Sequence, residues 1–432
     1  MSTSLSSQQA FASDTCAAAN SAEKHTPVIA AGLLTGGFDR PYAFGLAMAL
    51  ASQGILLDVI GSDEIDRPEL RSTPNINFLN LRGSKRAGSG LVARATRVIL
   101  FYARLIRYAA SAKPPIFHIL WNNKFQFLDR TLLMLYYKVL GKRIVLTVHN
   151  VNAGARDSSD SLWNRVTLRM QYFLADHLFV HTEKMKGELI NEFGIRDSAI
   201  SVIPFGINNS VPDTKLSPED AKQQLGIKDT ERTILFFGAI RPYKGLEHLV
   251  AAFKNLTTNG CEYRLIIAGE PKRGSEQYLS NIQESLEDEV RRGRVTQKIE
   301  FISDAETEIY FKAADLLALP YTYIFQSGVL LLAYSFGLPV VASDVGSFSQ
   351  DIVAGKTGFL CKPCDPIELA NTIENYFDSD LYQELDYRRQ EIREYARARY
   401  SWDVVGEITK SIYAELSDRR SMMLRLRGGN AW

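Results

Sequence analysis

Residues 233–253 read TILFFGAIRPYKGLEHLVAAF. The apolar run TILFFG ends at a glycine, and an amphipathic segment, GLEHLVAAF, follows after a short polar stretch. This order is typical of a β-strand that leads into an α-helix, as in parallel α/β sheets. Arg241 and Lys244 lie between the two, three residues apart, so both side chains can reach one anion. Cations are unfavourable at a helix N-terminus, which favours a bound diphosphate over two solvated charges.

The same alternation of short apolar runs and amphipathic segments extends through both halves of the chain. It predicts an α/β fold with two Rossmann-like, doubly wound domains that face each other across a cleft. The strands expected in the first half are 28–34, 55–61, 76–81, 115–121, 143–150, 177–182 and 200–206, and those expected in the second half are 233–238, 263–269, 298–303, 315–320 and 338–344.

Three breaks in this pattern divide the 432 residues, a length that already indicates two domains. Residues 1–25 are rich in Ser, Ala and Gln and are expected to be a disordered leader. A polar stretch, 207–232, is expected to be a linker with one short helix. We therefore predict an N-terminal domain over 26–207, a C-terminal domain over 208–395, and a last helix with its tail over 396–432. Ser401 is a candidate N-cap for that helix, which is expected to end near Leu416.

Composition bounds the environment of the protein. No basic region followed by an apolar run marks a signal peptide, and no charge-free apolar stretch of about 18 residues predicts a membrane span. Four cysteines fit a reducing compartment, and the lone pair Cys361 and Cys364 is expected to lie in a loop, with a redox or metal role as the alternative. Residues 1–210 carry 23 Lys and Arg against 16 Asp and Glu, so this half can face an anionic surface or a phosphate-bearing substrate.

Two further segments combine a strand end with residues suited to phosphate. Gly36 and Gly37 follow the first expected strand, where glycine lets the backbone approach a ligand; a plain tight turn is the alternative. Gln326, Ser327, Gly328 and Val329 open an apolar helix, so the cap and the glycine can admit phosphate oxygens to free N–H groups. An ordinary serine N-cap explains the same pattern.

Histidines close three of the expected strands. His149 ends RIVLTVHN and precedes a long loop, so we expect it to point into the cleft, where it can bond a sugar hydroxyl or assist an acceptor alcohol. The alternative is that His149 is a structural histidine. His118 and His181 also end strands and are the other candidates for the role in the cleft.

Arginines recur at helical spacing in residues 91–107. Arg94, Arg97, Arg104 and Arg107 alternate with apolar residues. Such a segment can lie on an anionic membrane, and a solvated helix face is an equally good interpretation.

Several of these segments together carry a resemblance to a known family. FFGAIRPYKGLEHLVAAF, LIIAGE, QSGVLLLAYSFGLPVVASDVG and GKTGFLCKPCDPIELA occur in the order found in family-four retaining glycosyltransferases, and the first half adds LTGGFDRPYAFGLAMAL and IVLTVHN. The resemblance covers about residues 28–415. It implies a GT-B fold with an acceptor-binding first domain, a donor-binding second domain and a C-terminal helix that crosses back to the first domain.

The resemblance also implies roles for individual residues. Arg241 and Lys244 would neutralise the donor diphosphate, and His149 would lie near the reacting sugar. The remaining donor-site residues implied by position or by the local patterns above are Gly36, Gly37, Gly238, Gly269, Glu270, Gln326, Ser327, Gly328 and Val329. No metal and no other cofactor is implied, because the basic pair takes the place of a metal.

One motif of the family is altered here. The family often carries two glutamates eight residues apart, and without gaps these positions fall on Ile324 and Leu332. A later acidic position is occupied by Gln350. Gln326 and Ser327 can substitute near the first site, so the chain is expected to represent a subgroup with QSGV in place of the acidic pair.

The expected activity is that of a metal-independent, retaining hexosyltransferase. It would move a sugar from a nucleotide-sugar to a glycan or lipid-linked acceptor in polysaccharide or glycolipid synthesis, in the cytoplasm or at the inner face of the membrane. No nucleic-acid partner is expected. The alternatives are a non-catalytic sugar-nucleotide-binding scaffold and a sugar-nucleotide epimerase. An epimerase needs acid and base carboxylates in the cleft, and the sequence offers no convincing set.

Overall fold

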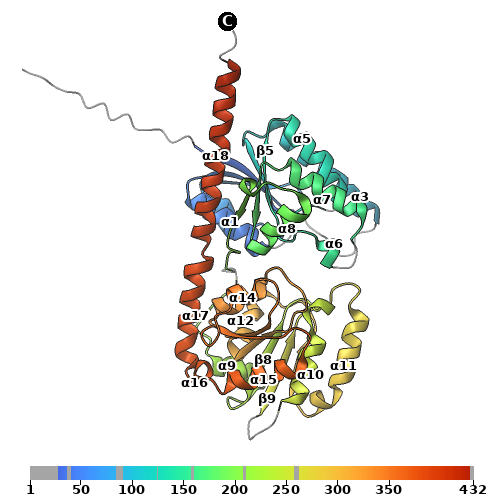
Figure 1. Cartoon of the computed structure of the whole chain (residues 1–432), viewed down its shortest axis with the longest axis vertical. Helices are drawn as coiled ribbons and strands as arrows, with labels where there is room; N and C mark the ends of the chain where they lie inside the picture. Colours follow the sequence, from blue (N-terminus) through green and yellow to red (C-terminus); the bar gives the residue numbers. More distant parts are fainter. Residues whose placement is uncertain are drawn as a thin grey trace, which may run out of the picture.

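The computed structural model describes residues 28–36, 40–83, 91–123, 125–156, 160–207, 211–256 and 262–428. Gly37 and the expected leader lie outside these residues. Two α/β domains are stacked along the long axis of the molecule, and a pair of long C-terminal helices runs beside both (Figure 1).

The first domain is built on a seven-stranded parallel sheet with the strand order β3-β2-β1-β4-β5-β6-β7. Its strands are β1 (Ala30–Leu34), β2 (Leu56–Gly61), β3 (Ile76–Asn80), β4 (Ile116–Ile119), β5 (Arg143–Thr147), β6 (His177–Val180) and β7 (Ile200–Val202). Its helices are α1 (Arg40–Ser52), α2 (Pro68–Ser72), α3 (Leu91–Ser111), α4 (Gln126–Leu128), α5 (Met134–Val139), α6 (Ala153–Arg156), α7 (Leu162–Leu174) and α8 (Glu183–Phe193), with a π-helical turn η1 (Asp129–Leu133) and a 3-10 turn η2 (Asp197–Ala199).

The second domain repeats this plan with a six-stranded parallel sheet in the order β10-β9-β8-β11-β12-β13. Its strands are β8 (Arg232–Phe237), β9 (Tyr263–Ala268), β10 (Val295–Lys298), β11 (Leu316–Leu319), β12 (Val340–Ser343) and β13 (Gly358–Cys361). Its helical elements are α9 (Pro218–Gln224), the 3-10 turn η3 (Pro242–Lys244), α10 (Leu246–Asn255), α11 (Glu276–Arg291), α12 (Asp304–Ala313), α13 (Gly328–Ser335), α14 (Phe348–Asp351), α15 (Pro366–Phe377), α16 (Asp380–Gln383), α17 (Leu385–Tyr400) and α18 (Trp402–Gly428).

The predicted fold class is confirmed, since both sheets are parallel, doubly wound and Rossmann-like. In each sheet the order in which successive strands are added reverses between two central strands, β1 and β4 in the first sheet and β8 and β11 in the second. Ligands of such sheets bind outside the carboxyl ends of the strands at this reversal. The topology therefore places a crevice at the end of β1 and β4 and another at the end of β8 and β11.

Two strands of the second sheet were not predicted correctly. The strand expected at 298–303 is wrong: β10 lies earlier, and Phe301, with 64% of its surface exposed, belongs to the loop that leads into α12. β13 was not predicted at all. Both are edge strands. An edge strand is covered on fewer sides, so β10 can read VTQK and lacks the apolar run that marks a central strand.

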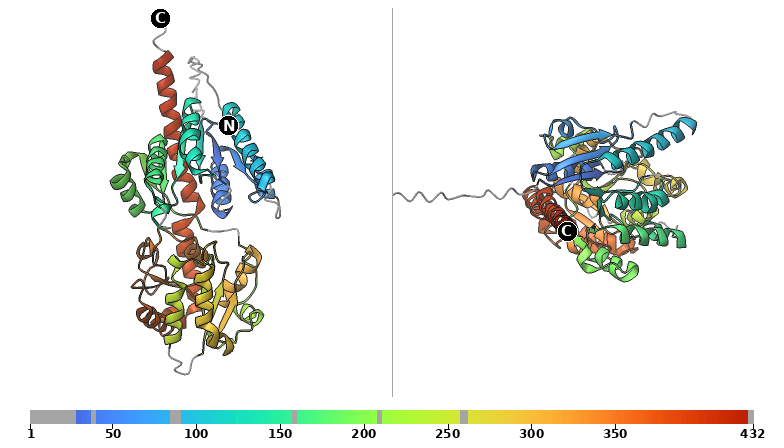
Figure 2. Two further views of the ribbon diagram at one scale, coloured as in Figure 1. Left: turned by 90° about the vertical axis from the view of Figure 1, so that its right-hand side faces the viewer. Right: turned by 90° about the horizontal axis from the view of Figure 1, so that it is seen from above.

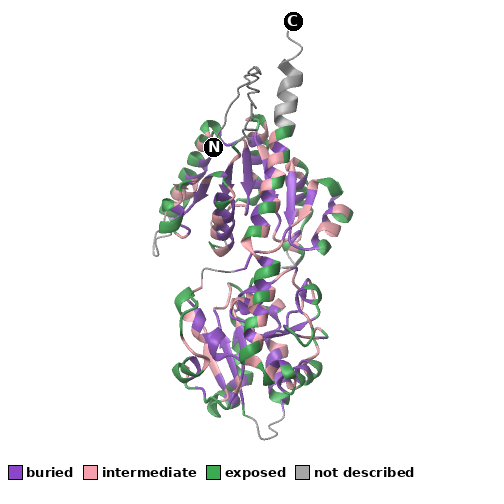
Figure 3. Cartoon of the chain, turned by 90° about the vertical axis from the view of Figure 1, so that its left-hand side faces the viewer, coloured by how far each residue is buried: buried purple, intermediate pink, exposed green. Residues whose placement is uncertain are grey.

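The core of the first domain lies on both faces of its sheet, because side chains of successive strand residues point to opposite faces. Leu34, Phe117 and Leu146 pack under α3, α5, α7 and α8, whereas Leu33 and Val145 pack under α1 and α18. Figure 3 shows the resulting buried strands between partly exposed helices. α18 thus completes the core of a domain from which it is distant in sequence.

The chain passes between the domains twice, near Ile207 and again between Tyr400 and Trp402, and hydrogen bonds join these two crossings. The backbone N–H of Ile207, in the first crossing, donates to the carbonyl oxygen of Tyr400 at 3.0 Å, and the indole of Trp402, in the second, donates to the carbonyl oxygen of Ile207 at 2.8 Å. The indole lies against two glycines: a Cβ atom on Gly45 or on Gly206 would come within 2.1 or 2.3 Å of its ring. The predicted C-terminal helix that crosses back is confirmed, but it continues to Gly428, so its expected end near Leu416 is wrong.

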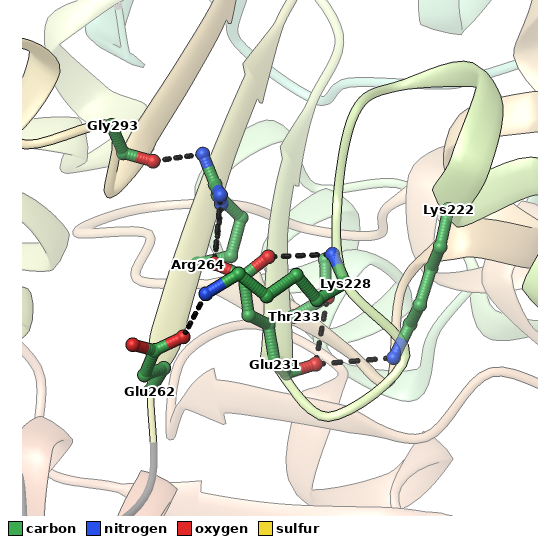
Figure 4. Close-up of polar contacts among 7 residues, drawn as sticks. All are labelled: Lys222, Lys228, Glu231, Thr233, Glu262, Arg264 and Gly293. Carbon is green, nitrogen blue, oxygen red and sulfur yellow. Dashed lines mark hydrogen bonds and ion pairs between the residues drawn. The ribbon is translucent and has the colours of Figure 1, made fainter.

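A polar cluster closes the opposite, amino end of the second sheet (Figure 4). Glu231 pairs with Arg264 at 2.7 Å and accepts the backbone N–H of Lys228 at 2.7 Å, while Lys222 donates to the carbonyl oxygen of Glu231 at 3.1 Å. Arg264 also donates to the carbonyl oxygen of Gly293. Because these groups lie at or before the amino ends of β8 and β9, they hold the loops at the end of the sheet that is remote from the expected ligand.

Replacement of Trp402 by alanine is expected to lower the free energy of unfolding by about 3–5 kcal/mol, since it leaves a cavity between the crossings and removes the bond to Ile207. Trp163, with 74% of its surface exposed, provides the matched control. Its change to alanine should cost less than about 0.5 kcal/mol. Urea denaturation followed by circular dichroism measures both, and equal losses would contradict this role of Trp402.

Candidate functional site

A pocket lies at the carboxyl ends of the strands, between the two domains. Its lining includes His149, Asn150, Trp121 and Arg130 of the first domain and Arg241 of the second. Trp121 follows β4 and His149 follows β5, whereas Arg241 follows β8. The two sequence-predicted residues His149 and Arg241, which are far apart along the chain, are therefore brought to one pocket.

His149 is held by an aromatic cage. Its ring stacks on Trp121 with ring centroids 4.1 Å apart and an interplanar angle of 1°, and Tyr42 meets it edge-on at 4.7 Å. Phe205 and His181 complete the cage. Burial lowers the pKa of His149 well below 6.5, and the neighbouring His181 and His118 lower this pKa further. The imidazole is therefore neutral at physiological pH.

A chain of hydrogen bonds determines which nitrogen of His149 carries the proton. His181 Nδ1 lies 3.2 Å from the carbonyl oxygen of Ile203, and a carbonyl only accepts, so this nitrogen is protonated. Burial lowers the pKa of His181 to about 4, so its Nε2 has no proton and accepts from His149 Nδ1 at 3.1 Å. His149 Nε2 is then left with a lone pair, and it can accept a hydrogen bond but cannot donate one.

Three buried acceptor atoms in this region have no hydrogen-bond partner within the described residues. They are His149 Nε2, Asn150 Oδ1 and Gln326 Oε1. A buried polar atom without a partner costs about 1–3 kcal/mol, so such atoms are expected where a ligand supplies the missing bonds. A ligand rich in hydroxyl donors matches this set.

The basic part of the site is Lys244. This lysine is 7% exposed and lies beside Gly238, where a Cβ atom would be 3.2 Å from its Nζ and 3.5 Å from Val329. Burial, together with the nearby positive charges of Arg241 and Lys272, lowers the pKa of the Lys244 ammonium to about 8. A buried cation without an anion is unfavourable, so the position is suited to a negatively charged ligand.

Glycines allow the two loops beside Lys244 to approach each other. Gly269 has φ +150°, and a Cβ atom there would lie 2.0 Å from the carbonyl oxygen of Gly238. The backbone N–H of Ile240 donates to the carbonyl oxygen of Glu270 at 2.8 Å. The carboxylate of Glu270 pairs with Lys272 at 2.5 Å and does not stand alone. These loops form one support for the basic site.

The start of α13 lies at the domain boundary. Ser327 caps the helix by accepting the N–H of Leu330 at 3.4 Å, as expected for an N-cap. Gly328 is exposed, and a Cβ atom there would be 3.8 Å from Phe205 of the His149 cage. The first N–H groups of this helix therefore lie close to the histidine site.

Gly36 lies against Trp121 of the same cage. It has φ +64°, and a Cβ atom there would come within 2.6 Å of the backbone oxygen of Trp121. Arg82 donates to the carbonyl oxygen of Gly36 at 2.6 Å. Gly37, predicted beside it, lies outside the described residues.

The two positions of the altered acidic motif, Ile324 and Leu332, carry apolar side chains that cannot bond a ligand hydroxyl. Leu332 is 6% exposed and packs in the core of the second domain. Ile324 lies in the loop before α13, where its carbonyl oxygen would be 2.1 Å from a Cβ atom on Gly346. A glutamate at Leu332 would need a different environment, so ligand contacts in this part of the site must come from other groups.

Several contributors to the site were not predicted from the sequence. Tyr42, Trp121, Phe205 and Arg130 were not identified as site residues, although Trp121 shares with His149 a position just after a strand. His181, an alternative to His149 from the sequence, is instead the hydrogen-bond partner of His149. His118, the other alternative, binds Tyr413 of α18 and Thr147, each at 2.7 Å. It therefore helps to attach α18. Among the described residues, no group of three His, Cys, Asp or Glu side chains could hold a metal ion.

Both domains match known families. Residues 41–211 match the family "Glycosyltransferase Family 4", and residues 217–399 match "Glycosyl transferases group 1". The chain is 24% identical over 395 residues to the "D-inositol 3-phosphate glycosyltransferase" of Corynebacterium efficiens, covering 87% of this chain and 89% of the relative. It is 26% identical over 280 residues to the protein of the same name from Corynebacterium diphtheriae, covering 62% of each.

Solved structures share the fold at low sequence identity. HepE of Anabaena in complex with UDP aligns over 90% of this chain and 100% of that chain, with a TM-score of 0.68 and 16% identity. Sucrose-phosphate synthase of Thermosynechococcus elongatus aligns over 91% of this chain and 100% of that chain, with a TM-score of 0.70 and 19% identity.

His149 is expected to remain neutral, with its proton on Nδ1, from pH 5.5 to pH 8. Long-range ¹H–¹⁵N NMR of histidine-labelled protein, assigned by comparison with His149→Gln, measures both properties. In His181→Phe the acceptor for Nδ1–H is lost, and the ring should change tautomer. A titration of His149 with a midpoint near 6.5 would contradict the proposed chain of hydrogen bonds.

Lys244→Met is expected to raise the free energy of unfolding of the unliganded protein at pH 7 by about 2 kcal/mol, because it removes a buried charge. The unfolded chain binds the Lys244 proton with the higher pKa, so the penalty is complete below about pH 8 and is relieved as pH rises from about 8 to 10.5. The gain should therefore shrink at pH 9.5.

Lys254→Met, at an exposed position on α10, is the matched control and should change stability by less than about 0.5 kcal/mol. Chemical denaturation at the two pH values makes the comparison. A Lys244→Met protein that is less stable than the parent would show that Lys244 is a structural cation.

Proposed function

We propose that this chain, which belongs to the glycosyltransferases of GT-B fold, transfers a hexose from a nucleotide-sugar to a glycan or lipid-linked acceptor with retention of the anomeric configuration. The observation that carries this proposal is the buried charge of Lys244, which lies beside Gly238 and next to Arg241. Among the described residues it contacts the ring of Tyr321 at 5.3 Å and forms no ion pair with a carboxylate. A donor diphosphate supplies the missing negative charge. UDP in the related HepE structure supports this kind of ligand.

The chemistry follows from where charge develops. When the bond between the sugar and the diphosphate breaks, negative charge increases on the leaving phosphate oxygens. Lys244 and Arg241 are placed to stabilise that charge, so the basic pair performs the role that a metal has in other transferases. The donor phosphates would also meet the free N–H groups at the start of α13, after the Ser327 cap.

The sugar and the acceptor would occupy the histidine side of the pocket. His149 Nε2 accepts a hydrogen bond from a sugar hydroxyl and holds the ring in place, while the amide oxygens of Asn150 and Gln326 can accept further hydroxyls. Arg130, 8% exposed, lines the same pocket and favours an acceptor with an anionic group. An acceptor hydroxyl on the leaving-group face would then attack the oxocarbenium-like sugar as the bond to the diphosphate breaks, and its proton would pass to the departing phosphate oxygen.

A non-catalytic sugar-nucleotide-binding protein is the second candidate. It is favoured by the buried Leu332 at a position where the family often has a glutamate. A scaffold would bind the nucleotide-sugar without releasing nucleotide. The proposed enzyme releases nucleotide in the cytoplasm, or at the inner face of the membrane when the acceptor is lipid-linked.

The proposal predicts that Lys244→Ala and Arg241→Ala each reduce nucleotide release from the cognate nucleotide-sugar by at least about a hundredfold, while the proteins remain folded. The donor is first identified by thermal shift with UDP, GDP, ADP and their common sugars, in the presence of EDTA. Lys254→Ala is the control and should retain full activity.

Full activity of either site variant would show that the diphosphate assignment is wrong. Binding without nucleotide release in the parent protein, with candidate acceptors present, would support the scaffold.

A further inference from the structure

The outer surface of one helical layer of the first domain is unusually apolar. Most of the exposed large apolar side chains in the described residues lie on it, and we call this surface the docking face. Its members are Val92, Ile99, Leu100, Ile106, Phe125, Phe127, Leu132, Leu135, Val139, Leu162, Trp163, Val166 and Phe173. They belong to α3, the α4–η1–α5 segment and α7, which lie side by side in the left panel of Figure 2.

These side chains do not belong to the core. On α3, Val92, Ile99 and Ile106 recur every seven residues and are 81%, 67% and 41% exposed. Phe101 and Leu105 of the same helix are buried under the docking face. α7 repeats this arrangement, with Trp163 74% and Phe173 81% exposed. Each helix thus has a second apolar side, which the fold of this chain does not cover.

The charges on the docking face are mainly positive; Asp160, just before α7, is paired with Arg165 at 2.6 Å. α3 contributes Arg94, Arg97, Arg104 and Arg107, and α7 contributes Arg165 and Arg169. The segments α3, α5 and α7 contain no acidic residue, and Asp129 in η1 is buried. An apolar surface surrounded by arginines is complementary to a partner that is apolar inside and anionic at its surface.

We propose that the docking face binds the surface of an anionic lipid bilayer. The apolar side chains would enter the boundary between headgroups and acyl chains, and the arginines would meet lipid phosphates. None of the described helices is long and apolar enough to cross a bilayer. A second copy of this chain is a poorer occupant, because a two-fold contact would place arginines of one copy against those of the other.

The docking face shares its elements with the pocket. Gln126 of α4 and Arg130 of η1 line the pocket, while Phe127 and Leu132 of the same segments are exposed on the docking face. α7 contributes Gln171 to the pocket and Phe173 to the docking face. Membrane binding would therefore bring the acceptor side of the site close to lipid headgroups. The docking face lies outside the donor site, so the two assignments can fail separately.

Vesicle co-sedimentation of the full chain tests the proposal. Binding is expected to vesicles of phosphatidylcholine with phosphatidylglycerol, to be much weaker on phosphatidylcholine alone, and to decline as salt rises. The double variants Ile99→Ser with Phe173→Ser, and Arg94→Glu with Arg107→Glu, should each weaken binding at least about tenfold.

Matched controls come from the second domain. Phe301→Ser with Ile367→Ser removes side chains of similar exposure, 64% and 67%, and Arg291→Glu with Lys356→Glu reverses two exposed charges. Both control proteins should bind vesicles like the parent. Equal binding by all four variants would overturn the proposal.

Trp163 reports the contact directly. Anionic vesicles should shift the tryptophan emission to shorter wavelength, and Trp163→Phe should lose the shift while it keeps vesicle binding. Light scattering tests whether a second copy of this chain covers the docking face instead. The membrane assignment would be overturned if the parent protein forms a dimer and does not bind vesicles, and if Ile99→Ser with Phe173→Ser dissociates that dimer. None of these measurements requires a nucleotide-sugar or turnover.

Discussion

The packing of Trp402 against two glycines is the constraint on which the arrangement of the domains depends. Gly45 belongs to α1 and Gly206 to the first crossing, so a single indole joins the C-terminal helix, the first domain and the linker. Its hydrogen bond to Ile207 connects both crossings. Without this contact, the two domains, each built on its own sheet, would have no fixed position relative to each other. With the crossings tied, Phe205 meets the start of α13, and the pocket acquires walls from both domains.

The site divides two physical tasks between the domains. The second domain supplies positive charge where water is largely excluded, at a cost in stability that an anionic ligand would offset. The first domain supplies a neutral histidine that presents a lone pair and is held by Trp121 and His181. A protonated histidine would add a third cation to the pocket and could not accept a hydroxyl proton. The burial that keeps His149 neutral therefore matters as much as its position.

The helices on one face of the first domain each have two apolar sides. Its helices α3, α5 and α7 bury one side against the sheet and leave a second apolar side uncovered. Periodicity alone could not distinguish the two sides of α3, because apolar residues occur on both and the arginines lie between them. The sheet decides which side is core. What remains outside is an apolar, positively charged surface next to the His149 side of the pocket.

The sequence by itself determined the fold class, the central strands, the start of the last helix and the strand-end segments that carry Gly238, Arg241, Lys244 and His149. Those features are local: an apolar run, a glycine and a polar residue adjoin one another in the chain. The edge strand β10, the cage of Tyr42, Trp121 and Phe205, and the proton position on His149 were decided only by the tertiary structure. Each depends on neighbours that are distant in sequence and meet through sheet order and burial, which no local pattern records.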